Sequence, residues 1–203
     1  MPNVIAINAA ARQGIIAAQT TSDEALLAGI ADGERNAMHV LYCRHNVRVI
    51  RFILRIVRDT TMAEDLVSQA FLDVWRTARQ FEGRSQVSTW LLSIARFKAL
   101  TSLRQRRYED IDQEDVLEIA DQADTPEATL DRSNTSAILR ACIAKLSPAH
   151  REIINLVYYH EKSVEEAGAI IGIPQSTVKT RMFYARKQLA ELLKSAGVDS
   201  LAA

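Results

Sequence analysis

The sequence has 203 residues, of which 48% are hydrophobic, and its 25 basic residues balance 25 acidic ones. This length fits one large domain or two small ones, and only seven Gly and four Pro favour helices over a fold rich in turns. No apolar run reaches the roughly 18–20 residues that cross a bilayer, and the N-terminus has no basic stretch like that of a signal peptide, so we expect a cytoplasmic protein without membrane insertion.

The first 20 residues show no sustained hydrophobic period, and we predict a loose tail for them. Thr21 and Glu24 have the spacing of a capping box and open a helical stretch with a turn predicted at Asp32-Gly33. Apolar residues recur in this stretch at intervals of three and four. They are Leu26, Leu27, Ile30, Met38, Leu41, Val49, Phe52, Ile53, Ile56 and Val57.

Two further helices complete a first predicted domain over residues 21–107. One begins at a second capping box, Thr61 with Glu64, and carries pairs of apolar residues four positions apart. These pairs are Met62/Ala63, Leu66/Val67, Ala70/Phe71 and Val74/Trp75. The other spans about 87–107. Its predicted apolar stripe is Trp90, Leu91, Ile94, Ala95 and Leu103.

The charge is unevenly distributed. Between Glu109 and Asp131 there are ten acidic residues and no Lys or Arg, which leaves the remaining chain with a net charge of +10. We therefore predict two basic domains joined by an acidic flexible linker over 108–133, with the second domain at 134–196 and a short tail at 197–203. Basic domains of this kind favour binding to nucleic acid, although the whole chain is neutral.

The second domain has the pattern of a helix-turn-helix over about 163–193. Ser147-Pro148 is a typical helix start, and Ser163 with Glu166 forms a capping box that opens a short helix. Gly168 and Gly172 stand four apart, which suits a small residue where two helices touch and a glycine with positive φ in the turn. A generic amphipathic hairpin with a solvated basic face is the alternative interpretation.

The long helix after Pro174 is predicted to have an inner and an outer face. The inner stripe is Val178, Met182, Ala185, Leu189 and Leu192. Short hydroxyl and amide side chains near its N-terminus, followed by basic residues, suit contacts with base edges and phosphates of duplex DNA. The candidate DNA-binding residues of this domain are Arg151, Gln175, Ser176, Thr177, Lys179, Thr180, Arg181, Phe183, Tyr184 and Lys187.

Signs of enzyme or metal chemistry are weak. The sequence contains no recognisable pairing of a nucleophile with a base and no glycine-rich phosphate loop, so we do not expect an enzyme. His39 and Cys43 have a spacing that can hold a metal, but nothing supplies the second half of a zinc pattern, and no metal or other cofactor is predicted. Cys43 and Cys142 are not expected to form a disulfide.

Both halves together resemble one family, the bacterial extracytoplasmic-function sigma factors, which are the smallest promoter-recognition subunits of RNA polymerase. In the first half the resemblance lies in residues 63–75 (AEDLVSQAFLDVW) and 88–96 (STWLLSIAR). In the second half it lies in 146–154 (LSPAHREII) and 172–181 (GIPQSTVKTR). The resemblance covers about 21–107 and 134–195 and leaves out the tail and the linker.

The resemblance implies an all-α fold of two small helical domains. The first, a sigma region 2 domain, is expected to dock on core polymerase and to recognise and melt the −10 element. The second, a sigma region 4 domain, is expected to read the −35 element. The implied partners are core RNA polymerase, through its β′ clamp and β flap, promoter DNA, and an anti-sigma factor. The free protein is expected to be a monomer.

The resemblance also assigns roles to side chains of the first domain. The helix from about 61 to 78 is expected to dock on the β′ clamp. Its predicted polymerase-binding residues are Asp65, Gln69, Leu72 and Arg76. An apolar Leu72 in this polar stripe suits a protein contact, although single exposed leucines are also common. The residues predicted to bind and melt the −10 element are Arg84, Trp90, Arg96, Phe97, Lys98 and Arg104, with Phe81 as a further stacking surface. Trp90 also fits the apolar stripe of its helix.

The sequence departs from the family pattern in two places. Phe97 and Thr101 stand where members often have Asn and Asp, and Phe183 and Tyr184 stand where small polar or basic residues are usual. The promoter sequence therefore does not carry over from the family. The alternative function is a stand-alone helix-turn-helix regulator that acts without polymerase, which would need neither the docking helix nor the first domain.

Overall fold

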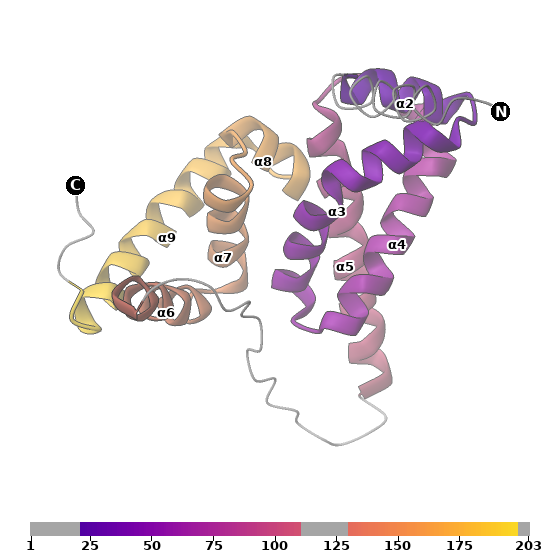
Figure 1. Cartoon of the computed structure of the whole chain (residues 1–203). Helices are drawn as coiled ribbons and strands as arrows, with labels where there is room; N and C mark the ends of the chain where they lie inside the picture. Colours follow the sequence, from indigo (N-terminus) through magenta and orange to yellow (C-terminus); the bar gives the residue numbers. More distant parts are fainter. Residues whose placement is uncertain (1–20, 111–129, 199–203) are drawn as a thin grey trace, which may run out of the picture. The chain divides into compact units, whose positions relative to one another are not determined.

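The computed structural model describes residues 21–110 and 130–198, whose regular structure is helical throughout (Figure 1). The chain divides into two compact units, 1–113 and 114–203, which are described separately. The predicted all-α fold of two helical domains is confirmed. The predicted tail at 1–20, most of the predicted linker and the last five residues lie outside the described part. In that part, no helix has the length and apolar character needed to span a membrane.

The first unit is built around helix α3. Its helices are α2 (Asp23–Ala31), α3 (Arg35–Val57), α4 (Thr60–Thr77) with a 3-10 turn at Ala78–Gln80, and α5 (Val87–Asp110). Helix α3 packs against α2, α4 and α5, and α4 packs against α5 (Figure 1). The apolar faces predicted from the sequence meet in one core. Its largest fully buried side chains are Leu41, Val49, Phe52, Ile53, Val74, Val87, Leu91 and Leu92.

Two helix caps differ from the prediction. The Ser22 hydroxyl accepts a hydrogen bond from the backbone N–H of Ala25 at 3.2 Å, and Oδ1 of Asp59 accepts one from the N–H of Met62 at 3.0 Å. Ser22 and Asp59 therefore cap α2 and α4, and the predicted capping boxes at Thr21 and Thr61 are wrong. For α4 the physical reason is that a carboxylate at the N-cap accepts a charge-assisted bond and also faces the positive end of the helix dipole.

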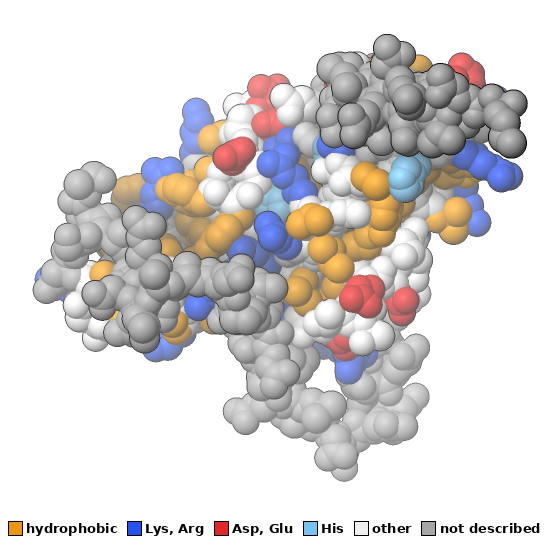
Figure 2. Space-filling model, in the orientation of Figure 1, with side chains coloured by type: hydrophobic (Ala, Val, Ile, Leu, Met, Phe, Trp, Pro, Cys, Tyr) orange, Lys and Arg blue, Asp and Glu red, His pale blue; other side chains and the backbone are white. Residues whose placement is uncertain are grey.

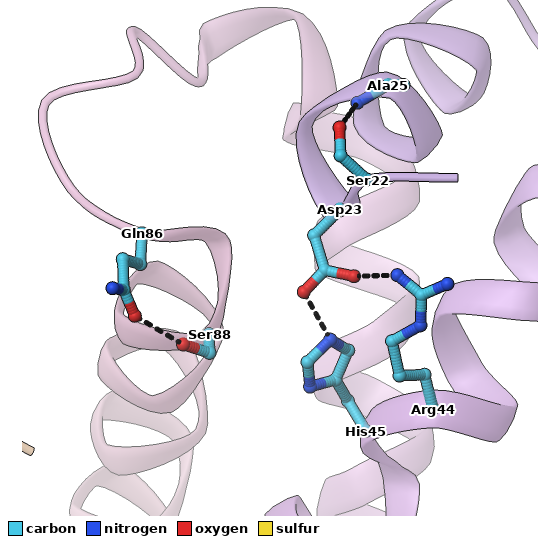
Figure 3. A network of polar contacts seen from close by, with 7 residues as sticks. All are labelled: Ser22, Asp23, Ala25, Arg44, His45, Gln86 and Ser88. Atoms are coloured by element: carbon cyan, nitrogen blue, oxygen red, sulfur yellow. Dashed lines mark hydrogen bonds and ion pairs between the residues drawn. The ribbon is translucent and has the colours of Figure 1, made fainter. Parts of the chain in front are cut away.

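Asp23 ties the start of α2 to the middle of α3 (Figure 3). One carboxylate oxygen contacts the Arg44 guanidinium, and the other lies 2.7 Å from Nε2 of the buried His45. Two contacts from neighbouring residues of α3 hold the same carboxylate. These contacts fix the start of α2, the helix that follows residues 1–20, against α3.

The second unit packs three helices against a long fourth one. They are α6 (Leu130–Ala144), α7 (Pro148–Ile154) followed by a π-helical turn (Asn155–Tyr159), α8 (Val164–Ile171) and α9 (Gln175–Ser195). Ser147 caps α7 as predicted, accepting from the N–H of His150 at 3.3 Å. The inner face of α9 is buried at Val178, Met182, Ala185 and Leu193, whereas the predicted Leu189 and Leu192 are only half-buried.

The turn between α8 and α9 has the predicted geometry. Ser163 and Glu166 form both hydrogen bonds of the capping box, and Glu166 also pairs with the buried ammonium of Lys162 at 2.7 Å. Gly172 ends α8 with φ 79°, in the left-handed region that favours glycine. A Cβ on Gly168 would lie 2.9 Å from the carbonyl oxygen of Ile173. Helix α8 therefore approaches the turn more closely than any other residue type allows.

Replacing Gly168 with Ala should destabilise the second unit. The added methyl meets a backbone oxygen, which cannot rotate away as a side chain can, so we expect a loss of about 1–3 kcal/mol in the free energy of unfolding. Urea unfolding followed by circular dichroism measures it. A169S, at the neighbouring exposed position of α8, is the control. Equal stability of G168A and the unaltered protein would contradict the close contact.

The cap of α4 should make stability depend on pH. The backbone hydrogen bond from Met62, and after it Arg106, lower the pKa of Asp59 from its ordinary value of 3.8. A lowered folded-state pKa adds stability above the unfolded-state value, and this stability is lost as the pH falls through the folded-state value.

We therefore expect D59N, which keeps a good cap without the charge, to be less stable than the unaltered protein at neutral pH. The difference should shrink progressively below pH 3.8. Denaturant unfolding at a series of pH values tests this. In R106A, which removes one cause of the lowered pKa, the difference should be smaller at neutral pH, and its pH-dependent part should be lost over a narrower range below pH 3.8. A difference that does not vary with pH would be the contrary result.

Candidate nucleic-acid and protein interfaces

The outer face of α9 presents a stripe of side chains to solvent. Ser176, Lys179, Thr180, Phe183 and Lys187 are all exposed, and their spacing places them on one side of the helix. Phe183, with 64% of its surface exposed, lies between the two lysines along this stripe. Its ring meets Tyr184 edge to face, with centroids 5.4 Å apart. The stripe therefore combines hydroxyl, cationic and apolar groups.

The remaining candidates on α9 flank this stripe. Gln175 and Tyr184 are exposed, whereas Thr177 and Arg181 are half-buried. The Thr180 hydroxyl donates to the carbonyl of Ser176 at 3.0 Å, so its hydrogen is engaged by the helix while its lone pairs face solvent.

A shallow hollow of about 640 Å³ lies beside the stripe. Its lining residues are Val157, Val164, Lys179, Met182, Phe183, Arg186 and Lys187. The Arg186 guanidinium stands over the ring of the exposed Tyr158, 5.7 Å from its centroid. The sequence pattern did not indicate this aromatic and cationic edge, because Tyr158 belongs to the π-helical turn before α8 and comes near α9 only in the folded unit.

Arg151 is the one candidate of this unit outside α9. It is half-buried on α7, and Nη2 donates to the carbonyl oxygen of Leu146 at 3.4 Å. Part of its hydrogen-bonding capacity therefore serves the turn before α7.

The outer face of α5 carries three of the −10 candidates in a line. Trp90, Phe97 and Arg104 stand seven residues apart, so they share one side of the helix. Phe97 is 65% exposed. Trp90 is half-buried and packs against Phe81, with ring centroids 5.2 Å apart. It belongs to an aromatic pair at the edge of the core rather than to the fully buried stripe that the apolar pattern also allowed.

Internal partners engage several cations of this unit. Lys98 Nζ lies 2.7 Å from Asp73 Oδ2 on α4, and Arg84 Nε lies 2.5 Å from Glu82 in the loop before α5. Arg96 is half-buried and also has an interaction partner, and Arg104 donates to the carbonyl of Leu100 at 3.3 Å. Sequence spacing identified these cations but could not indicate which of them face an acidic neighbour.

The outer face of α4 holds the predicted docking residues. Asp65, Gln69, Leu72 and Arg76 are all exposed, with Leu72 47% exposed among three polar neighbours. A shallow hollow of about 410 Å³ runs along the seam between α4 and α5. It is lined by Asp59, Thr61, Met62, Asp65, Leu66, Gln69, Ser102 and Arg106. The α5 side of this hollow was not apparent from the sequence.

The cysteines are free thiols, Cys43 exposed on α3 and Cys142 buried. Cys43 Sγ lies 3.6 Å from Nε2 of His39, as their spacing on one helix suggests. Within residues 21–110 and 130–198, no three His, Cys, Asp or Glu side chains come together as a metal centre would require.

Comparison with known proteins relates both units to one class of transcription factor. Residues 41–108 match the Sigma-70 region 2 family, and residues 142–191 match the Sigma-70, region 4 family. The first match contains the outer faces of α4 and α5, and the second contains the α8–turn–α9 motif and all ten DNA-binding candidates of the second unit.

Similar proteins extend over nearly the whole chain. The ECF RNA polymerase sigma factor SigL of Mycobacterium tuberculosis is 30% identical over 179 residues, which are 86% of this chain and 98% of SigL. The RNA polymerase sigma factor CarQ of Myxococcus xanthus is 34% identical over 165 residues, 80% of this chain and 92% of CarQ.

A solved structure agrees with these relatives. The sigma factor RpoE of Bartonella quintana, in complex with the anti-sigma factor NepR, aligns with a TM-score of 0.65 at 29% identity, covering 75% of this chain and 94% of RpoE. The structure of CnrH, in complex with the cytosolic domain of CnrY, shares the fold with a TM-score of 0.62 at 24% identity, covering 86% and 99%. The two sigma-70 regions and the full-length relatives show that this chain belongs to the ECF RNA polymerase sigma factors, the alternative sigma factors that direct transcription.

Proposed function

We propose that this sigma factor docks on core RNA polymerase through the outer face of α4, reads the −35 element with α9 and melts the −10 element with α5. The observation that carries most weight is the exposed stripe of α9. Its side chains face solvent while the opposite side of the same helix is held in the core. A rigid helix that presents hydroxyl, cationic and apolar groups in one line suits insertion into a major groove.

The residues of the α9 stripe have separable tasks in this proposal. Lys179 and Lys187 neutralise phosphates, which supplies affinity without sequence preference. Ser176 and Thr180 lie one turn apart near the N-terminus of the helix. Ser176 is placed to accept or donate a hydrogen bond at a base edge, and Thr180, whose hydroxyl hydrogen is engaged by the helix, is placed to accept one. Phe183 offers apolar contact, such as with a thymine methyl group.

Helix α5 supports the melting step. Extruding a base from a duplex costs a few kcal/mol, and stacking on an aromatic ring returns about 1–3 kcal/mol per base. The exposed ring of Phe97 and the half-buried pair of Trp90 with Phe81 provide stacking surfaces, and Arg104 lies on the same face for the backbone phosphates. This mechanism needs no covalent chemistry, so we propose a binding factor and not an enzyme.

The docking role of α4 is supported by its mixed surface. Leu72 is apolar and half-exposed, and polar side chains that can pair with a partner surround it. Protein interfaces commonly have such a desolvated centre with a polar rim. The hollow at the seam with α5 adds a concave surface next to Asp65 and Gln69. We propose that the β′ clamp occupies this surface and that the β flap binds the second unit.

Regulation by an anti-sigma factor is part of the proposal. RpoE of Bartonella quintana was solved with the anti-sigma factor NepR, and this chain aligns with almost all of that sigma factor. We propose that the protein acts in the cytoplasm, is monomeric when free, and serves a stress- or signal-responsive set of promoters after release from such a partner.

The proposal predicts that a charge at Leu72 separates polymerase binding from DNA binding. L72E should weaken the complex with core polymerase at least tenfold, because it places a carboxylate in the desolvated centre, and should abolish promoter-dependent transcription in vitro. Binding of the free protein to duplex DNA should stay unchanged. L72M, which keeps an apolar contact, is the control. A stand-alone regulator would show no complex with core polymerase and the same activity for all three proteins.

A second prediction concerns phosphate contacts of α9. K179A should weaken binding to matching and unrelated duplexes alike and lower the slope of log affinity against log salt by about 1. Fluorescence anisotropy over a salt series measures both. The matched control is K194A, an exposed lysine about 22 Å further along α9. An unchanged slope for K179A would exclude Lys179 from the phosphate contacts.

A further inference from the structure

Helix α3 carries a second apolar stripe on the side away from the core. Its members follow one another at i, i+3, i+7, i+10 and i+14, the heptad spacing at which one helix face packs against another chain segment. They are Val40, Cys43, Val47, Ile50 and Leu54, called the outer stripe here. Val47 is 53% exposed, Cys43 is exposed and the other three are half-buried. Figure 2 shows hydrophobic side chains gathering along α3.

The outer stripe is long enough to hold a docked segment. Fourteen residues of helix span about 21 Å. The opposite side of α3 packs within the first unit, where its side chains Leu41, Val49 and Phe52 are fully buried. The other side of a helix packed on one face is normally polar, so a continuous apolar line there indicates a binding surface.

The tail, residues 1–20, joins the fold at the start of α2, which packs on the other side of α3 from this surface, against the buried His45. Asp23 contacts Arg44 and His45, which lie between Cys43 and Val47 along α3 (Figure 3). The chain therefore enters α2 within the length of the outer stripe, about 7 Å along the axis from Val40 and about 14 Å from Leu54. To reach the outer stripe the tail has to pass around α3, and an extended chain of 20 residues, which reaches up to about 66 Å, is long enough for this path.

The chemistry of the tail matches that of the outer stripe. Its only charged side chain is Arg12, and five of its residues are β-branched and apolar. These are Val4, Ile5, Ile7, Ile15 and Ile16. The members of the outer stripe are uncharged, so they suit such a segment better than the acidic segment between Glu109 and Asp131.

We propose that residues 1–20 dock on the outer stripe of α3 in the free protein and cover Cys43. The tail then covers an apolar surface of the first unit, to which it is joined in the same chain. A partner that uses the same surface has to displace it. This inference does not depend on which promoter the protein reads.

The thiol of Cys43 provides a direct test in the full-length chain. Its reaction rate with a chromogenic aromatic disulfide reports whether the outer stripe is covered. Helical circular dichroism reports any unfolding, because the buried Cys142 lies in the second unit and reports on that unit alone. I15D with I16D, which places charges in the tail, should raise the rate at Cys43 about tenfold if the tail is docked nine-tenths of the time. Q13D with Q19D adds the same charge at polar positions and should leave the rate unchanged.

A second variant tests the other side of the contact. V47N, which makes the surface polar without placing a charge one turn from the thiol, should also raise the rate at Cys43, while the rate at Cys142 and the helical circular dichroism stay the same. Three results would overturn the proposal: an unprotected Cys43 in the unaltered protein, equal rates for the two tail variants, or protection that disappears on dilution. The last would show that a second copy of the chain covers the outer stripe.

Discussion

The close approach of Gly168 to the carbonyl of Ile173 is the constraint on which the candidate recognition surface of α9 depends. It brings α8 against the turn, and Gly172 then takes the positive φ that redirects the chain into α9. With this geometry set, Val178 and Met182 enter the core and the opposite side of α9 faces solvent. The orientation of every candidate DNA contact on α9 thus follows from the absence of one side chain on α8.

The helices of the first unit are arranged in the same way. One side of each helix is held in the core, and the opposite side faces solvent. Helices α4 and α5 bury their apolar sides against α3, which leaves Leu72 on one outer face and Phe97 on another. Since these faces belong to different helices, the proposed polymerase docking and strand capture use different side chains. Rigid helices hold both sets of groups without a ligand, which lowers the entropic cost of binding.

The cations of the two units have different neighbours. Lys98 pairs with Asp73 and Arg106 with Asp59, so these side chains link α5 to α4 and its cap. These four side chains are only half-buried, and ion pairs that water reaches contribute little stability. The cations of the α9 stripe, Lys179 and Lys187, stand instead beside aromatic and apolar groups. Carboxylates therefore engage cations of the first unit, whereas the lysines of the α9 stripe line a hollow with aromatic and apolar side chains.

The sequence by itself determined the helices, their buried faces and the helix-turn-helix, because these depend on local spacing of three or four residues and on glycine and capping residues. It also placed Phe183 and Leu72 on outer faces by the same periodicity.

Contacts between distant segments were decided only in the tertiary structure. The packing of Phe81 on Trp90, the pairing of Lys98 with Asp73 and the edge that Tyr158 adds to α9 are of this kind. The caps at Ser22 and Asp59 also differed from the pattern, because neighbouring polar residues compete for the same backbone N–H groups and the pattern does not show which of them is placed to accept. Periodicity indicates which side of a helix is buried, but the neighbours that it meets depend on how the helices pack.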